Sequence, residues 1–186
     1  MKDIIIQLIS IAGLVFNVSS FQQKNKHALI LIQLFGAILF SVHFFLLGAY
    51  TGFLINLICI LRATVFSFEN MQEKTRKLWI VLLISAYLIA YVLAFAVFKI
   101  EFTPLNALIE ALPTLGICLV TVSFGIGGIF RVRAFSSVNS LGWLTYNLVH
   151  HSVGGVLTEV ICLISIAIGV IRHDLKNIKK AEPSKD

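Results

Sequence analysis

The sequence predicts an all-α protein that crosses a membrane seven times, as two parallel triple-helix repeats joined by one linker helix. Composition supports the membrane part of this prediction, because 58% of the 186 residues are hydrophobic and only 13% are charged. A soluble domain cannot bury that much apolar surface, so the solvent must be lipid. The order of the apolar runs and an internal repeat support the rest.

Three apolar runs make up the first predicted repeat, residues 1–68. The first helix spans about residues 4–20, and because a basic cluster follows this run, we expect a retained helix and not a cleaved signal peptide. The second and third helices span about residues 28–47 and 49–68, each near the ~20 residues that a spanning helix needs. The short connection between them predicts antiparallel neighbours.

A linker segment, residues 69–104, separates the repeats. It begins with a charged loop and continues into a helix at about residues 78–98. The second repeat covers residues 105–172, and its glycine-containing basic stretch at 125–139 predicts a flexible loop. Its three helices are expected at about residues 105–124, 140–153 and 154–172.

The basic residues divide unequally between the two ends of this predicted bundle. Lys2 and Lys99 lie on the amino-terminal side, and the other 13 of the 15 Lys and Arg residues lie at or beyond the opposite face. We expect Arg62 to extend to the lipid headgroups on that face. The positive-inside rule then places the amino terminus outside and the charged tail, residues 173–186, in the cytoplasm. Since the basic residues occupy short loops and a tail, we expect no nucleic-acid partner despite the formal charge of +6.

The internal repeat relates residues 34–61 to residues 141–170. Five residues of the first stretch match five residues of the second stretch at one constant offset in sequence. When this offset is shortened by three residues, Asn56 matches Glu159. The matched sets are Gly36, Phe40, Ser41, Gly48 and Ala49 with Gly142, Tyr146, Asn147, Gly154 and Gly155. A single linker crossing makes both repeats enter the membrane in the same direction, and parallel repeats form one transporter architecture with a substrate site between the halves.

Polar side chains inside the apolar runs mark the candidate site. A carboxylate in hydrocarbon costs a few kcal/mol on insertion scales, so Glu110 and Glu159 are expected to face the bundle interior or a solvated cavity. Helical depth, at 1.5 Å per residue, predicts that these two converge with Asn56, His43 and His150 on a small chamber in the outer half of the membrane. The carboxylates there could bind a cationic or polyhydroxyl group, and a glutamate beside a histidine is suited to proton coupling.

Other side chains have a functional and a structural interpretation. Trp143, Tyr146 and Asn147 could contact a solute, although aromatic residues in membrane helices commonly serve packing. Pro113, one turn from Glu110, could form a hinge or a static kink. Glu110 could also reach the headgroups, and Glu159 could make only a structural hydrogen bond.

The sequence shows no pattern of catalytic, metal-binding or cofactor-binding residues. The adjacent His150 and His151, with Glu159 two turns away, are a weak metal pattern. The three cysteines lie inside apolar runs, where we expect them to pack. We therefore expect a protein that is not an enzyme and that needs no cofactor or metal.

Several stretches resemble the SWEET and PQ-loop superfamily. They are G-A-I-L-F-S at 36–41 and G-W-L-T-Y-N at 142–147, each followed by a glycine hairpin and by a polar residue at Asn56 or Glu159. Within it, the stretch at 33–56 and G-G-V-L-T-E at 154–159 most closely resemble the YgjV family of bacterial inner-membrane proteins, which is similar to the PnuC vitamin-precursor transporters.

The resemblance covers about residues 11–170 and implies facilitative or ion-coupled transport of a small polar solute across the bacterial inner membrane. The solute class that the resemblance implies includes sugars, nucleosides and vitamin precursors. The chain departs from the superfamily in having no Pro-Gln dipeptide and in holding Glu159 where SWEETs repeat an Asn. A receptor or scaffold subunit that does not transport is the alternative, and a homo-oligomer is compatible with both.

Overall fold

A computed structural model describes residues 2–20, 26–66, 71–126 and 129–171. These residues form seven α-helices and no strand, which confirms the all-α class and the expected number of helices. The helices are α1 (Lys2–Ser20), α2 (Lys26–Leu47), α3 (Tyr50–Phe66), α4 (Glu73–Ala96), α5 (Pro104–Ile126), α6 (Ile129–Val149) and α7 (Val153–Gly169).

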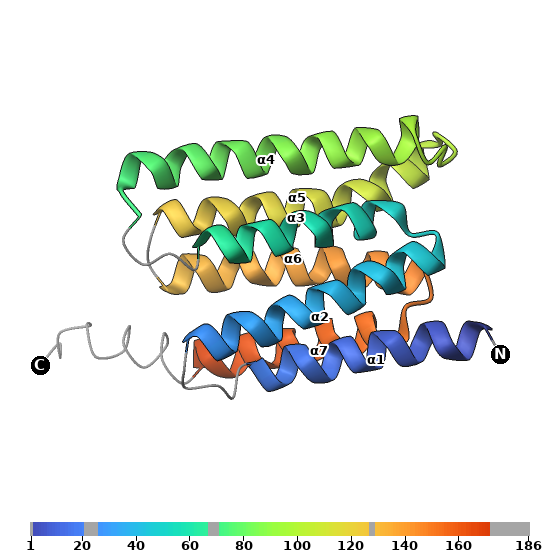
Figure 1. Ribbon diagram of the computed structural model, residues 1–186, viewed down its shortest axis with the longest axis horizontal. Coiled ribbons are helices and arrows are strands. Elements are labelled where there is room, and N and C mark those ends of the chain that lie inside the picture. Colours follow the sequence, from blue (N-terminus) through green and yellow to red (C-terminus); the bar gives the residue numbers. More distant parts are fainter. Residues whose placement is uncertain (1, 21–25, 67–70, 127–128, 172–186) are drawn as a thin grey trace, which may run out of the picture.

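The helices run roughly parallel to one another (Figure 1), and the contacts between them form a closed ring. Each helix packs against its neighbours in the chain, and α1 packs against α7. Because α3 also contacts α5, α4 lies on the outside and bridges these two helices. We call the end that holds the start of α1 and the turns after α2, α4 and α6 the amino-terminal end, and the opposite one the far end.

The outer surface of the bundle is more apolar than that of a soluble protein, while the interior contains both apolar and polar side chains. Large apolar side chains face outward along the helices, as with Val81, Ile89 and Val92 of α4, which are each about 60% exposed. His43, Glu110 and Asn147 are buried. An apolar exterior of this extent is typical of a surface that contacts lipid.

Helix length supports the same conclusion for part of the bundle. Among the described residues, Glu73–Ala96 and Pro104–Ser123 are long and apolar enough to cross a membrane. Shorter apolar helices cover Asp3–Ser19, Leu34–Leu47, Tyr50–Val65 and Val153–Ile168.

The predicted end of α6 at residue 153 was wrong, because α6 ends at Val149. Two predicted helix starts were also wrong, and both of these errors treated polar helical turns as loop. Helix α4 begins at Glu73 and not near residue 78, and Glu73 pairs with Lys77 one turn later at 2.7 Å. Helix α6 begins at Ile129, so most of the loop predicted at 125–139 is helical. The Ser137 hydroxyl donates a hydrogen bond to the Arg133 carbonyl oxygen at 3.0 Å, so this polar side chain has a hydrogen-bond partner within the helix. The predicted tail at 173–186 lies outside the described residues.

Candidate functional site

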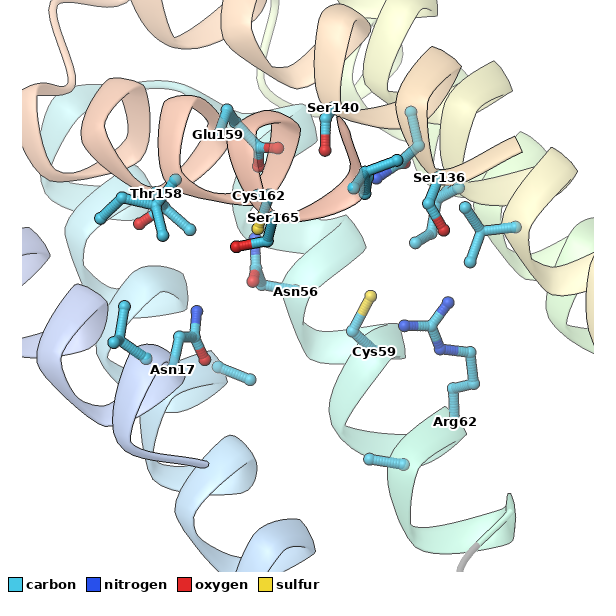
Figure 2. Close-up of a pocket in the computed structure, with 18 of the residues that line it drawn as sticks. Asn17, Asn56, Cys59, Arg62, Ser136, Ser140, Thr158, Glu159, Cys162 and Ser165 are labelled. Carbon is cyan, nitrogen blue, oxygen red and sulfur yellow. The ribbon is translucent and has the colours of Figure 1, made fainter. Parts of the chain in front are cut away.

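A cavity of about 760 Å³ occupies the middle of the ring (Figure 2). Every helix except α4 contributes to its lining, which contains Val18, Ala63 and Ile166 within one turn of the far ends of α1, α3 and α7. The cavity therefore extends to the far end, and its volume is that of a small-molecule site. Its polar lining residues are Asn17, Asn56, Arg62, Arg133, Ser136, Asn139, Ser140, Thr158, Glu159 and Ser165.

Two of the residues predicted from the sequence meet in this cavity. Glu159 of α7 lines the cavity together with Ser140 of α6. Asn56 of α3 donates from its amide nitrogen to the Gly52 carbonyl oxygen at 2.8 Å, within its own helix. Arg62, which was expected to reach the headgroups, lines the cavity. A carboxylate, an amide and a guanidinium group thus share one space inside the ring.

A narrow extension of about 150 Å³ continues from the cavity towards the amino-terminal end. Its walls include the aromatic side chains of Phe40, Phe44 and Trp143, together with Asn147. Asn147 is 1% exposed, and its side-chain oxygen has no hydrogen-bond partner among the described residues. Gly155 allows the Asn147 carboxamide to pack against the backbone of α7, because a Cβ at this position would collide with the Asn147 side chain.

The amino-terminal end is closed by hydrogen bonds that join α1–α3 to the segment of α6 and α7. Within the described residues there are five, which we call the latch: Gln7 with His151 and with Val153, Ser10 with Gly154, His43 with Ser152, and Tyr146 with Gly52. Each joins groups more than 90 positions apart in sequence. The latch therefore depends on tertiary packing and not on local structure.

Most latch bonds cap the starts of α3 and α7, where backbone N–H groups have no partner within the helix. The Tyr146 hydroxyl of α6 accepts the Gly52 N–H of α3 at 2.9 Å. From α1, the Gln7 side-chain oxygen accepts the Val153 N–H at 3.0 Å, and the Ser10 hydroxyl accepts the Gly154 N–H at 3.1 Å. In an apolar medium these groups must find a partner inside the protein, so each capped helix is held by a side chain from the other half of the ring.

His43 has partners for both ring nitrogens, which makes its role in this state structural. Its Nδ1 lies 2.8 Å from the Ile6 carbonyl oxygen, which can only accept, so Nδ1 carries a proton. Its Nε2 lies 2.8 Å from the Ser152 hydroxyl, which accepts the Gly155 N–H at 3.2 Å and can donate its own proton to the ring. A neutral imidazole thus satisfies every group in this chain of contacts.

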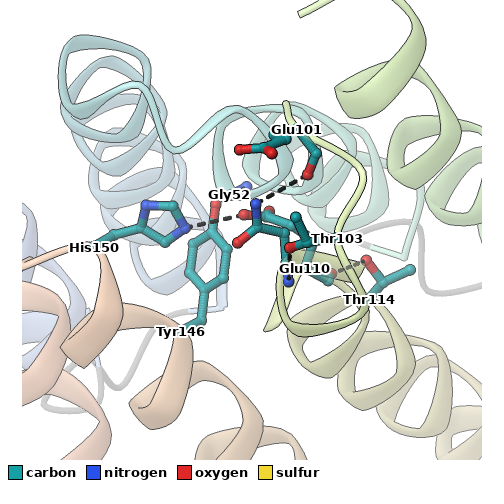
Figure 3. A network of polar contacts seen from close by, with 8 residues as sticks. Gly52, Glu101, Thr103, Glu110, Thr114, Tyr146 and His150 are labelled. Carbon is teal, nitrogen blue, oxygen red and sulfur yellow. Dashed lines mark hydrogen bonds and ion pairs between the residues drawn. The ribbon is translucent and has the colours of Figure 1, made fainter. Parts of the chain in front are cut away.

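Glu110 and His150 form a second polar cluster next to the latch (Figure 3). Glu110 Oε1 lies 3.1 Å from His150 Nε2, and the glutamate side chain is 3% exposed. The Glu110 Oε2 atom has no hydrogen-bond partner among the described residues, and the Tyr146 side chain lies close to this carboxyl group in Figure 3. Glu110 therefore faces the bundle interior and not the headgroups.

The predicted single chamber is in fact two separate places, and this corrects the sequence interpretation. Asn56, Glu159, Trp143 and Asn147 line the cavity or its extension. The remaining members of the predicted set, His43, Glu110, Tyr146 and His150, belong to the closed amino-terminal end. The larger cavity lies towards the far end, opposite to the expected position. Depth along a helix says nothing about the direction in which a side chain points, which is why the prediction merged the two groups.

Pro113 lies inside α5, which continues through it from Pro104 to Ile126. The neighbouring Thr114 hydroxyl donates to the Glu110 carbonyl oxygen at 3.0 Å. The hinge role of Pro113 stays a prediction.

Sequence reasoning omitted several residues from the site. Arg133 was assigned to a loop, and Ser152 was assigned to a helix although it is the N-cap of α7. Gln7 and Ser10 share one face of α1 at a helical spacing, which predicts from the sequence that this face turns inward but does not identify its partner on α7. In the part of the chain that the structure describes, no three His, Cys, Asp or Glu side chains are placed to hold a metal ion.

Comparison with known proteins identifies a family. The sequence matches the Imp-YgjV family, described as a bacterial inner membrane protein, over residues 4–177. Searches of curated proteins and of solved structures found no match. An apolar exterior, buried polar groups and this match over nearly the whole chain lead to one conclusion: the chain belongs to the Imp-YgjV family of bacterial inner membrane proteins.

Proposed function

We propose that the protein transports a small polar solute across the inner membrane, by alternating access to the central cavity. The observation that carries the proposal is the asymmetry of the cavity, which reaches the far end while the latch closes the amino-terminal end. In this proposal α1–α3 and α5–α7 are two triple-helix units, α4 is the linker, and the solute binds between the units. The protein is not an enzyme in this role.

Backbone geometry supports the proposed repeat, at a different alignment from the one read in the sequence. Gly48 and His151 both have a positive φ, +74° and +55°, and they are 103 positions apart. Three backbone hydrogen bonds around Gly48 recur around His151 at this same shift of 103 positions. His151 and Ser152, and not Gly154 and Gly155, therefore occupy the turn positions that correspond to Gly48 and Ala49.

Side chains support the repeat at the same shift. It relates His43 to Tyr146 and Gly52 to Gly155. Tyr146 accepts the Gly52 N–H directly, and His43 reaches the Gly155 N–H through the hydroxyl of Ser152. The two halves of the latch thus have related designs, as expected for parallel units around an axis along the membrane normal.

The orientation in the proposal follows from the positive-inside rule. The amino terminus is external and the carboxyl terminus is cytoplasmic, so the cavity of this state opens to the cytoplasm. The proposed parallel triple-helix units favour a SWEET-like protein, and the absence of a nucleotide-binding motif favours facilitative or ion-coupled transport. Sugars, nucleosides and vitamin precursors are the starting solute classes, and the proposal allows a homo-oligomer.

Native cysteines allow a direct test of alternating access. Cys59 lines the cavity, whereas Cys118 of α5 is half-buried outside its lining. Variants that retain only one of these two cysteines are reconstituted in vesicles of known orientation and treated with a membrane-impermeant maleimide on one side at a time. The transporter proposal expects Cys59 to react from the cytoplasmic side and, more slowly, from the external side. The Cys118 variant supplies the background rate.

The alternative role on this scaffold, a receptor or a structural subunit, predicts a cavity that stays open to one side. Reaction of Cys59 from the cytoplasmic side alone, combined with no solute flux in proteoliposomes, would sink the transport proposal.

A further inference from the structure

The charged groups of the cavity are separated along the membrane normal. Arg62 lies six positions beyond Asn56 on α3, and Arg133 lies seven positions before Ser140 on α6. Both arginines lie four positions from the far end of their helices, and Glu159 lies ten positions from the far end of α7. At a rise of 1.5 Å per residue, both arginine backbones are therefore roughly 9 Å nearer the far end than the Glu159 backbone. Two helices from different units therefore place a cation at the same depth, on the cytoplasmic side of the one carboxylate in the described lining.

This arrangement discriminates between solutes by charge. A guanidinium group matches a carboxylate with two parallel hydrogen bonds, and a carboxylate such as Glu159 attracts an ammonium group. A solute whose only charge is positive must pass the positive charges of Arg62 and Arg133. A solute whose only charge is negative provides no positively charged partner for Glu159. Inside a low-dielectric bundle both mismatches are more costly than in water.

The extension beyond Glu159 is also suited to a cation. Trp143 and Phe44 form part of its wall, with ring centroids 5.6 Å apart, and aromatic faces attract ammonium groups. The carboxamide of Asn147 lines the same space and has an oxygen without a partner. Rotation of this amide towards the extension would supply a hydrogen-bond acceptor to an incoming N–H group.

We propose that the solute of this cavity is a small zwitterion that carries a primary ammonium group and a carboxylate. The ammonium group lies towards Glu159 and the aromatic extension, and the carboxylate lies towards Arg62 and Arg133. This inference rests on the proposed function, because it names the class of solute that the same cavity would transport. It replaces the broader classes of neutral sugars and nucleosides.

A matched set of probes built on a four-carbon chain tests the inference on the purified full-length protein. The probes are 4-aminobutanoate, butanoate, butylamine and 4-acetamidobutanoate, with glycine and 6-aminohexanoate to vary the distance between charges. Binding is measured by calorimetry and by thermal unfolding, because a ligand that binds only the folded state raises the melting temperature. We expect at least one amino acid of the set to bind at least tenfold more tightly than every singly charged probe.

Variants assign the two charges of the solute separately. Glu159→Gln should remove the preference for the zwitterion over the carboxylate alone, and Arg133→Gln should remove the preference over the amine alone. Glu101→Gln is the matched control, because Glu101 is exposed near the start of α5 and is outside the cavity lining. If Glu159→Gln fails to fold, Arg133→Gln and the wild-type probe series still decide the question.

Equal binding of the zwitterion and the singly charged probes, or binding of none of them, would overturn the inference. The two proposals fail differently. Flux of a neutral sugar or nucleoside without zwitterion binding removes this inference and leaves transport intact. Zwitterion binding without flux, with Cys59 reactive from one side only, removes transport and leaves the binding site intact.

Discussion

Replacement of Tyr146 by phenylalanine should open the amino-terminal end of the bundle. The change removes one oxygen and leaves the ring in contact with Phe44, Trp143 and His150. Its main consequence in the closed state is a buried Gly52 N–H group without an acceptor. This group is at the start of α3, so no carbonyl of its own helix can replace the lost partner.

The size of the effect follows from the cost of an unsatisfied buried donor. That cost is about 1–3 kcal/mol, and at about 1.4 kcal/mol per factor of ten the closed state loses roughly 5- to 150-fold in population relative to an open state that hydrates the N–H. The measurement is the rate of maleimide labelling of Cys59 from the external side, which should rise within this range.

Tyr91→Phe provides the matched control for this prediction. Tyr91 donates its hydroxyl proton to the Ala107 carbonyl oxygen at 3.1 Å, between α4 and α5 and away from the latch. The two variants therefore lose the same atom in different places. If Tyr146→Phe and Tyr91→Phe leave external labelling equally slow, the latch does not hold the closed state and the reasoning is refuted.

Three further predictions concern stability, and thermal unfolding in detergent measures each of them. His150→Ala should destabilise the protein by about 1–3 kcal/mol, because the buried Glu110 carboxyl group loses its hydrogen bond to the ring, and the same change should cost less in a Glu110→Leu background. Equal losses in both backgrounds would contradict the coupling. Gly154→Ala should cost about 1–3 kcal/mol or more, because its new methyl group would collide with the backbone of α1, and an unchanged melting temperature would show that α1 and α7 are farther apart than described. Glu73→Gln should leave the melting temperature unchanged, because Glu73 and Lys77 are both more than 60% exposed, and a large drop would contradict this.

Much of the fold could be read from the sequence because hydrocarbon imposes a simple rule on the backbone. Each spanning segment must satisfy its own hydrogen bonds, so apolar runs of about 20 residues become helices and the breaks between them become turns. The rule placed α1, α2, α3, α5 and α7 within a few residues of their observed limits. It failed at the starts of α4 and α6, where polar and charged residues continue the helix beyond the apolar run.

The candidate site was only partly predictable. Glu159 and Asn56 were chosen because polar groups are costly in lipid, and both line the cavity. The same argument selected His43 and Tyr146, which have hydrogen-bond partners in the latch and do not line the main cavity. The cost of burying a polar group shows that it needs a partner, but not whether that partner is a protein group or a solute.

The sequence by itself determined the solvent of this protein, its helices and the set of polar residues that must face inward. Those features depend on composition and on the spacing of residues along one helix, which are local properties. Only the tertiary structure decided that Gln7 and Ser10 cap α7, that Arg62 and Arg133 share a depth with each other, and that Glu159 is separated from Glu110. These relations depend on the rotation of each helix about its axis and on the contacts between helices distant in the chain, where α1 meets α7 and the ring closes.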